Sequence, residues 1–138
     1  MGTPAGDLTL REHEMTIRVR YQETDGQGRV HHANYINFFE VGRVEFLRSA
    51  GHSYKELEAT GIFLVVTEIG CQYLAPAQYD DELQLKTIVV RAQGVRIEHR
   101  YEVRSGNQLI AIGRSVVAAV DRSGKVCRLP KFLKIKTT

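Results

Sequence analysis

The sequence of 138 residues has no tryptophan, only three prolines and two cysteines, and no long apolar run. The cysteines, Cys71 and Cys127, lack the C-x-x-C spacing of zinc and redox sites, so we expect both to be packing residues. No apolar stretch approaches the ~20 residues that a helix needs to cross a bilayer. The sequence therefore predicts a protein that does not bind a membrane.

Motifs for nucleotide, serine-hydrolase and metal chemistry are also missing. The sequence contains no G-x-x-x-x-G-K, G-x-G-x-x-G, G-x-S-x-G or H-E-x-x-H string. We therefore expect no cofactor and no metal site. The first residues lack the basic and apolar regions of a signal peptide, which predicts a cytoplasmic location.

The composition that is present is that of an ordinary globular protein. Hydrophobic residues make up 43% and charged residues 25%, and the formal charge is +3. The basic residues are scattered without an aromatic-basic motif, so we expect no nucleic-acid partner. The length favours one domain. We predict a flexible lead over residues 1–13 and a single domain over 14–138.

The periodicity predicts an α+β fold with one long helix. Residues 15–21 alternate as a strand does, and further strands are expected over 62–75, as one piece or two around Gly70, and over 82–91, 95–104 and 108–121. Tight turns at Gln93-Gly94 and Gly106-Asn107 make the pairing mostly antiparallel. The last strand is apolar on both sides, so it should be central and covered on both faces.

The long helix should follow the turn formed by Asp25, Gly26 and Gly28 and end at Gly51, in the C′ position. At 100° per residue one side of it is apolar, and this stripe consists of Tyr35, Phe38, Phe39, Gly42, Phe46 and Ala50. A short second helix should follow, capped by Ser53. One helix cannot cover both faces of a five-stranded sheet, so the sequence predicts a homo-oligomer.

A string of fixed spacings surrounds the turn before this helix, from Tyr21 to Arg43. It reads Tyr21-x-Glu23-Thr24-Asp25-x-x-Gly28-x-Val30-x-His32-Ala33-Asn34-Tyr35, followed by Phe38-Phe39-Glu40 and Arg43. This pattern resembles the signature of the 4-hydroxybenzoyl-CoA thioesterase family. Further matching residues follow along the chain: Thr67-Glu68-Ile69, Tyr73, Pro76, Tyr79-Asp80-Asp81-Glu82-Leu83 and Arg128-Leu129-Pro130.

The resemblance implies a hotdog fold, in which an antiparallel five-stranded sheet wraps one long helix. It also implies dimers, often paired into homotetramers, with active sites between subunits. The implied activity is hydrolysis of an acyl-CoA thioester, with coenzyme A as part of the substrate. An acyl-carrier-protein thioesterase is the nearest alternative, and a dehydratase or a non-catalytic acyl-CoA-binding protein are more distant ones.

Thioester hydrolysis needs a carboxylate or an activated water, together with donors that stabilise charge on the thioester oxygen. The family's catalytic aspartate matches Asp25, as nucleophile or general base, although an aspartate is also a common turn residue. His32 matches the helix-start position whose backbone N–H polarises the substrate carbonyl. We expect its neighbour His31 to be a surface residue.

Other candidates have supporting roles. Glu40 is a second possible carboxylate, but we expect it to pair with Arg43 or a neighbouring loop. Tyr21 and Asn34 flank the turn and are expected to shape the pocket. Four basic residues are candidates for the phosphates of coenzyme A: Arg91, Arg96, Arg128 and Lys131.

Overall fold

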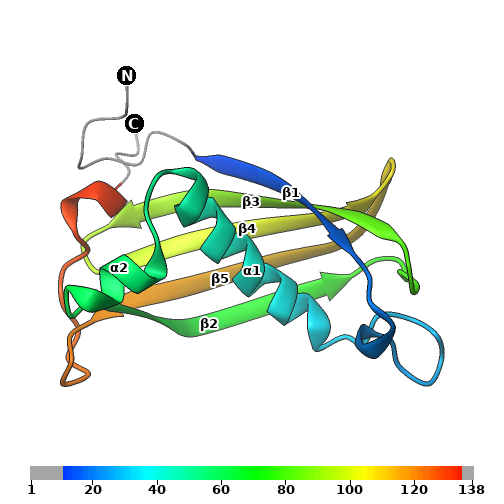
Figure 1. Cartoon of the computed structure of the whole chain (residues 1–138), viewed down its shortest axis with the longest axis horizontal. Coiled ribbons are helices and arrows are strands. Elements are labelled where there is room, and N and C mark those ends of the chain that lie inside the picture. The colour runs from blue at the N-terminus through cyan, green and yellow to red at the C-terminus, as the bar shows by residue number, and fades with distance from the viewer. Residues whose placement is uncertain (1–10, 135–138) are drawn as a thin grey trace.

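The computed structural model describes residues 11–134, and a five-stranded antiparallel sheet forms its centre (Figure 1). The sheet order is β1-β3-β4-β5-β2, where β1 is Glu12–Arg18, β2 Phe63–Tyr73, β3 Glu82–Gln93, β4 Arg96–Ser105 and β5 Gln108–Val120. A long helix, α1 (Asn34–Ser49), lies across one face of the sheet, and a short helix, α2 (Tyr54–Ala59), follows it. Two 3-10 turns span Tyr21–Glu23 and Lys131–Leu133. The predicted α+β architecture, with a sheet around one long helix, is confirmed.

The first strand is shifted from its predicted position. β1 pairs with β3 from Glu12↔Ile88 to Arg18↔Glu82, so Glu12 and His13 belong to the sheet rather than to a flexible lead. Arg11 is also described, and its carbonyl accepts from the Val89 N–H at 2.8 Å, whereas residues 1–10 of the predicted lead lie outside the described part of the chain. β1 ends at Arg18 because the chain then turns into the Tyr21–Glu23 helix. The alternation correctly predicted which residues of the strand face the core. Its first residue was not predicted, because the strand begins with charged residues.

Strands β2 and β5 differ from expectation in detail. β2 is one continuous strand, and its irregularity is a bulge between Val66 and Glu68 rather than a break at Gly70. β5 lies between β4 and β2, and α1 covers only one of its sides. Cover of its other face, which the sequence assigns to a partner subunit, stays a prediction. The hairpin turns are confirmed, with positive φ at Gly94 (66°) and Gly106 (59°).

The ends of α1 are of two different kinds. At its C-terminus Gly51 has a φ of 89°, and the N–H groups of Gly51 and His52 donate to the carbonyls of Arg48 and Leu47. These two bonds complete a Schellman motif and satisfy carbonyls that the helix leaves unpaired. At its N-terminus the capping residue is Ala33, which has no side-chain acceptor. Among residues 11–134, no side chain caps this end of the helix.

The helix approaches the sheet closely because glycine stands at two contact points. A Cβ at Gly113 on β5 would overlap the ring of Phe39, and one at Gly42 on α1 would overlap Thr87. Without those atoms Phe39 stacks on Tyr101 at a ring-centroid distance of 4.3 Å. The predicted aromatic stripe is confirmed, since Tyr35, Phe38, Phe39, Gly42 and Phe46 are all buried and Ala50 is partly buried.

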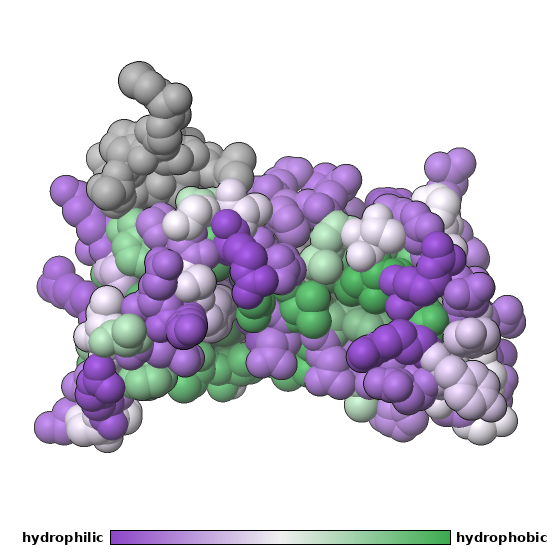
Figure 2. Space-filling model, viewed as in Figure 1, coloured by the Kyte–Doolittle hydropathy of each residue, from purple (hydrophilic) through white to green (hydrophobic). Residues whose placement is uncertain are grey.

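The helix-facing side of β2 extends beyond the cover that α1 provides. On this side Val66, Ile69 and Tyr73 are 46%, 38% and 50% exposed. Hydrophobic residues gather along the side of the molecule where β2 runs (Figure 2). Because β2 is an edge strand with an apolar rim, it has the features of a surface that pairs with another chain.

We predict that Gly113→Ala lowers the free energy of unfolding by about 1–3 kcal/mol, because the new methyl group forces the Phe39 ring out of its place. Chemical denaturation measures this change. Gly70→Ala is the matched control, since Gly70 lies on the neighbouring strand and its added Cβ would meet Arg114 only at an ordinary 3.7 Å. Equal stability of the two variants would contradict the close-packing role of Gly113.

Candidate active site

Asp25 lies in a tight turn between the Tyr21–Glu23 helix and α1. Its Oδ1 accepts hydrogen bonds from the backbone N–H groups of Gln27 (2.8 Å) and Arg29 (3.2 Å). The bond from Gln27 is the main cause that holds the pKa of Asp25 below its usual value. Asp25 is therefore ionised at neutral pH. Among the described residues, Oδ2 has no hydrogen-bond partner and is available for chemistry.

Glu23 holds this turn against the start of α1. The Glu23 side chain is buried, and its carboxylate accepts from the backbone N–H of Arg20 (2.7 Å) and pairs with the Arg20 guanidinium (3.1 Å). The Glu23 carbonyl accepts from the N–H of His31 and from the amide of Asn34, both at 2.8 Å. One buried residue thus fixes both the Asp25 turn and the first residue of the helix.

Among the described residues, the backbone N–H of His32 is a free donor just before α1. The N–H of Asn34 donates to the His31 carbonyl, and the N–H of Ala33 donates to Nδ1 of the His31 ring. The N–H of His32 has no acceptor among residues 11–134. A free N–H at a helix N-terminus favours negative charge on a bound atom.

Asp25 and His32 line one hollow of about 290 Å³. Its other walls are Arg29, Val30, Tyr35 and the segment Tyr73–Pro76 at the end of β2. The hollow thus combines an ionised carboxylate with an unpaired N–H donor next to apolar and aromatic side chains. This is the combination that nucleophilic or water-mediated attack on a carbonyl requires.

Comparisons with known proteins show to which family the chain belongs. The model of the thioesterase-like superfamily matches residues 19–136. The chain belongs to the thioesterase-like superfamily. It is 34% identical over 106 residues to the acyl-CoA thioester hydrolase YbgC of Escherichia coli, covering 76% of this chain and 79% of the relative.

Solved structures of thioesterases have the same fold. A probable thioesterase from Bartonella henselae superposes with a TM-score of 0.81 at 35% identity, over 86% of this chain and 99% of the other. A 4-hydroxybenzoyl-CoA thioesterase mutant in complex with 4-hydroxybenzoyl-CoA superposes with a TM-score of 0.77 over 88% and 93% of the two chains. At 17% identity the latter shows the fold alone. The family resemblance seen in the sequence is confirmed.

The residues predicted around the turn do not all lie at the hollow. Tyr21 is 77% exposed and its ring packs edge-on against Tyr79, outside the hollow. Asn34 shapes the site indirectly, through its bond to Glu23. His31 is exposed, as predicted, and its ring stacks on that of His32 at 4.2 Å. The sequence pattern did not indicate that His31 also accepts the Ala33 N–H.

The four basic residues predicted to bind phosphate lie at the other end of the sheet. Arg91 and Arg96 flank the β3–β4 turn, and the Leu129 N–H donates to the Gly94 carbonyl, which brings the segment containing Arg128 and Lys131 to the same end. Along β5, the partner of Arg96 is Ala118 and that of Tyr73 is Ala111. At 3.3 Å per residue these points are about 23 Å apart. One chain does not bring the basic residues to Asp25.

Arg43 has a role that the sequence did not reveal. We expected a pair between Glu40 and Arg43, but Glu40 is exposed and the buried Arg43 guanidinium donates to the Tyr101 hydroxyl at 2.9 Å. That hydroxyl also bonds to Ser115. Helical spacing places Arg43 next to the apolar stripe, which is the one signal in the sequence that it faces the core.

His99 lies next to this network and is almost fully buried. Burial is the main cause that lowers the pKa of His99 to about 3, and the nearby Arg43 charge adds to it. Its Nδ1 has no hydrogen-bond partner in the described part of the chain. His99 is therefore a neutral core residue at physiological pH.

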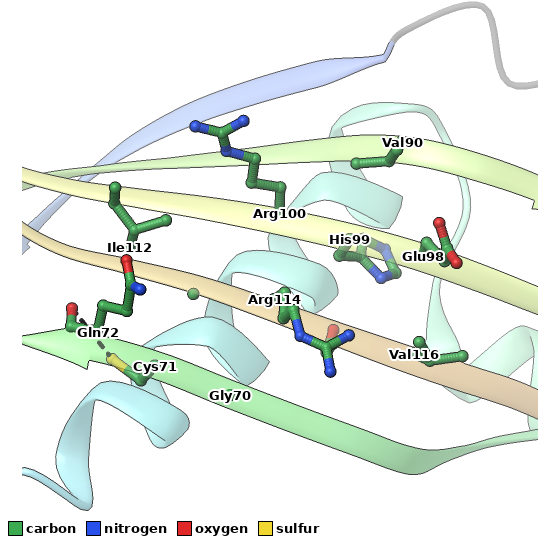
Figure 3. Close-up of a pocket in the computed structure, with 12 residues that line it drawn as sticks. Gly70, Cys71, Gln72, Val90, Glu98, His99, Arg100, Ile112, Arg114 and Val116 are labelled. Carbon is green, nitrogen blue, oxygen red and sulfur yellow. Dashed lines mark hydrogen bonds between the residues drawn. The ribbon is translucent and has the colours of Figure 1, made fainter.

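A larger hollow, of about 560 Å³, lies on the face of the sheet away from α1 (Figure 3). Its rim includes Arg100, Arg114 and Glu98 from β4 and β5, with Val90 and Ile112 as apolar walls. This surface holds no carboxylate beside an unpaired backbone donor. We therefore take the smaller hollow at Asp25 as the candidate site, because reactive groups rather than size define a catalytic site.

Three further features concern residues 11–134. Neither helix there is long and apolar enough to cross a membrane. No group of three His, Cys, Asp or Glu side chains there is arranged to hold a metal ion. Cys71 and Cys127 are both free and partly buried.

His99 makes stability depend on pH in a predictable direction. Because its folded pKa is about 3 and its unfolded pKa is near 6.5, the unfolded chain binds the proton more readily as pH falls below 6.5. We predict that protonation of His99 in the unfolded chain lowers the free energy of unfolding by about 2–3 kcal/mol when the pH falls from 7 to 4.5.

Denaturation of the native protein and of His99→Phe at these two pH values measures this contribution. The variant should lose less stability on acidification, while the carboxylates that both proteins share titrate alike. Identical pH dependence of the two proteins would contradict a buried neutral histidine.

Proposed function

We propose that this protein hydrolyses an acyl-CoA thioester to the free acid and coenzyme A. The observation that carries the proposal is the hollow that Asp25 and His32 share. The carboxylate there is ionised and has one oxygen free, and the N–H of His32 is unpaired among the described residues. The E. coli relative named as an acyl-CoA thioester hydrolase supports the substrate class.

The residues support two routes, and in both of them attack on the thioester carbon moves the carbonyl electron pair onto oxygen. In one route Asp25 Oδ2 attacks the thioester carbon, and the carbonyl electron pair moves onto oxygen, where the His32 N–H stabilises it. Collapse expels the thiolate of coenzyme A and leaves a mixed anhydride, which water hydrolyses. In the other route Asp25 takes a proton from water as that water attacks the carbon, and collapse of the tetrahedral intermediate expels the thiolate of coenzyme A, which receives the proton from Asp25. Neither route needs a bound cofactor or metal.

The basic residues favour a carrier with phosphate groups. Arg91, Arg96, Arg128 and Lys131 gather at one end of the sheet and can pair with phosphate oxygens. An acyl carrier protein is the alternative, because its pantetheine arm presents the same thioester. We favour coenzyme A because a cluster of four cations suits a small polyphosphate.

We further propose that two copies join antiparallel along β2. The edge is unpaired in one chain and has an apolar rim of Val66, Ile69 and Tyr73 beside the candidate site. A two-fold axis at this edge would bring the basic end of each copy to the same end of the joined sheet as the Asp25 of the other. This arrangement would overcome the distance of about 23 Å that separates the basic residues from the candidate site within one chain. We also propose that the enzyme is cytoplasmic. Its dimers pair into tetramers through the outer face of the sheet.

Replacing the carboxylate tests the catalytic role. We predict that Asp25→Asn lowers kcat by a factor of about 10² or more, because the amide can neither attack nor take a proton. Thiol release from a panel of acyl-CoA and acyl-carrier-protein thioesters measures the rate. The panel also ranks the two carriers.

The chain offers a matched control for this variant. Asp121 caps its turn as Asp25 does, accepting from the N–H groups two and four residues later, those of Ser123 (2.9 Å) and Lys125 (3.0 Å). It lies outside the hollow. Asp121→Asn should therefore retain native activity. Full activity of Asp25→Asn would overturn the proposal, and equal losses in both variants would assign the effect to turn stability.

The proposed dimer has its own test. We predict that Ile69→Arg converts the assembly to monomers, because it places a charge on the apolar rim of β2. Sedimentation equilibrium measures the mass. Val90→Arg, on the outer face, should keep the dimer and abolish only a tetramer. A dimer that survives Ile69→Arg at micromolar concentration would contradict pairing along β2.

A further inference from the structure

Tyr73 connects the end of β2 to the peptide next to the candidate oxyanion donor. It is the last residue of β2 and lies opposite Ala111, on the side of the sheet that faces α1. Its hydroxyl donates to the backbone carbonyl of His32 at 3.0 Å. This is a long-range bond, because 41 residues separate the two partners.

The carbonyl that Tyr73 contacts has no role in the helix itself. His32 precedes Ala33, the N-cap, so its carbonyl stands before the first one that accepts an intrahelical bond. Glu23 holds the neighbouring residues His31 and Asn34 from the turn side. Among the described residues, the Tyr73 hydroxyl makes the only hydrogen bond to the backbone of His32, and it comes from the sheet side.

Aromatic contacts hold the Tyr73 ring in the orientation that this bond requires. Its centroid lies 5.5 Å from that of the buried Tyr35 and 6.3 Å from that of His32, both in edge-to-face geometry. Edge-to-face pairs stabilise such arrangements beyond the area that they bury. Tyr35 in turn packs against Phe38 in the core. The hydroxyl is therefore supported by the core through two rings.

We propose that Tyr73 is a positioning residue that aims the N–H of His32 at the thioester oxygen. The inference rests on the proposed function. Rotation about the His32 backbone changes where its N–H points, and anchoring the His32 carbonyl limits that rotation. Catalytic donors must stay within about 0.5 Å and 10–20° of their productive geometry. A displacement of about 1 Å costs as much as 10²-fold in rate.

The Tyr73 hydroxyl remains a donor under the conditions of the assay. Burial is the first cause that raises the pKa of Tyr73, and the neighbouring Cys71 thiol raises it further. Its proton is therefore retained through neutral and mildly alkaline pH.

The first test removes only the hydroxyl. Tyr73→Phe should lower kcat about 10-fold, the equivalent of one hydrogen bond, while KM changes less than twofold and the melting temperature stays the same. Tyr79→Phe is the matched control, since Tyr79 is exposed to a similar extent and its hydroxyl makes no hydrogen bond among residues 11–134. Native kcat in Tyr73→Phe, or a fall in kcat that follows a lower melting temperature, would overturn the inference.

The second test measures how strongly the His32 N–H polarises the thioester carbonyl. Hexanoyl-CoA and benzoyl-CoA, labelled with ¹³C at the carbonyl, are bound to Asp25→Asn and to Asp25→Asn/Tyr73→Phe, and difference infrared spectra give the carbonyl stretching frequency. We expect Asp25→Asn to lower the frequency relative to the free thioester, and the double variant to lose at least half of that shift.

The outcomes of these tests distinguish the positioning role of Tyr73 from the proposed hydrolytic function. A lowered frequency that is equal in both variants would overturn the role of Tyr73 and leave the hydrolytic proposal standing. No lowering in Asp25→Asn would remove the role of the His32 N–H, and the inference with it. Loss of activity in Asp25→Asn would still support a catalytic carboxylate in that case.

Discussion

The close approach of α1 to the sheet is the constraint on which the rest of the molecule depends. It is possible because Gly113 and Gly42 lack the atoms that would separate Phe39 and Thr87 from the opposite element. This contact sets the depth of the helix, and the helix in turn sets where its N-terminus meets the end of β2. The candidate site lies at that meeting point, so core packing determines the geometry of the reactive groups.

The turn that carries Asp25 shows how little local geometry says about chemistry. The chain builds a turn of the same form twice, at Asp25 and at Asp121, and each has a glycine of positive φ three residues later. In both turns the aspartate pKa is lowered by hydrogen bonds from the turn. The two turns differ in their surroundings, because only the Asp25 turn leads into an uncapped helix and faces a hollow.

The proposed pairing of two chains would bring the charged and apolar surfaces together. A single chain separates Asp25 from the basic residues by much of the length of the sheet, and it leaves the apolar rim of β2 open. An antiparallel pairing at that edge addresses both features at once. The buried Arg43 has a different role, since its bond to Tyr101 ties the middle of α1 to β4.

The sequence by itself determined the type and order of the main elements. Periods of 2 and 3.6 residues marked the strands and α1, Gly51 marked the end of the helix, and Ser53 marked the start of α2, where its side chain accepts the Glu56 N–H. Each of these signals is local, because it depends on backbone conformation within a few residues. The string around Asp25 likewise indicated the superfamily and the two residues that share the hollow.

Only the tertiary structure decided which distant groups meet. It showed that Arg43 pairs with Tyr101 rather than with Glu40, that Tyr21 lies outside the hollow, and that Tyr73 reaches His32. It also placed the basic residues at the far end of the sheet from Asp25. The physical reason is that strand register and helix depth fix these contacts, and both are set by packing between segments far apart in the chain.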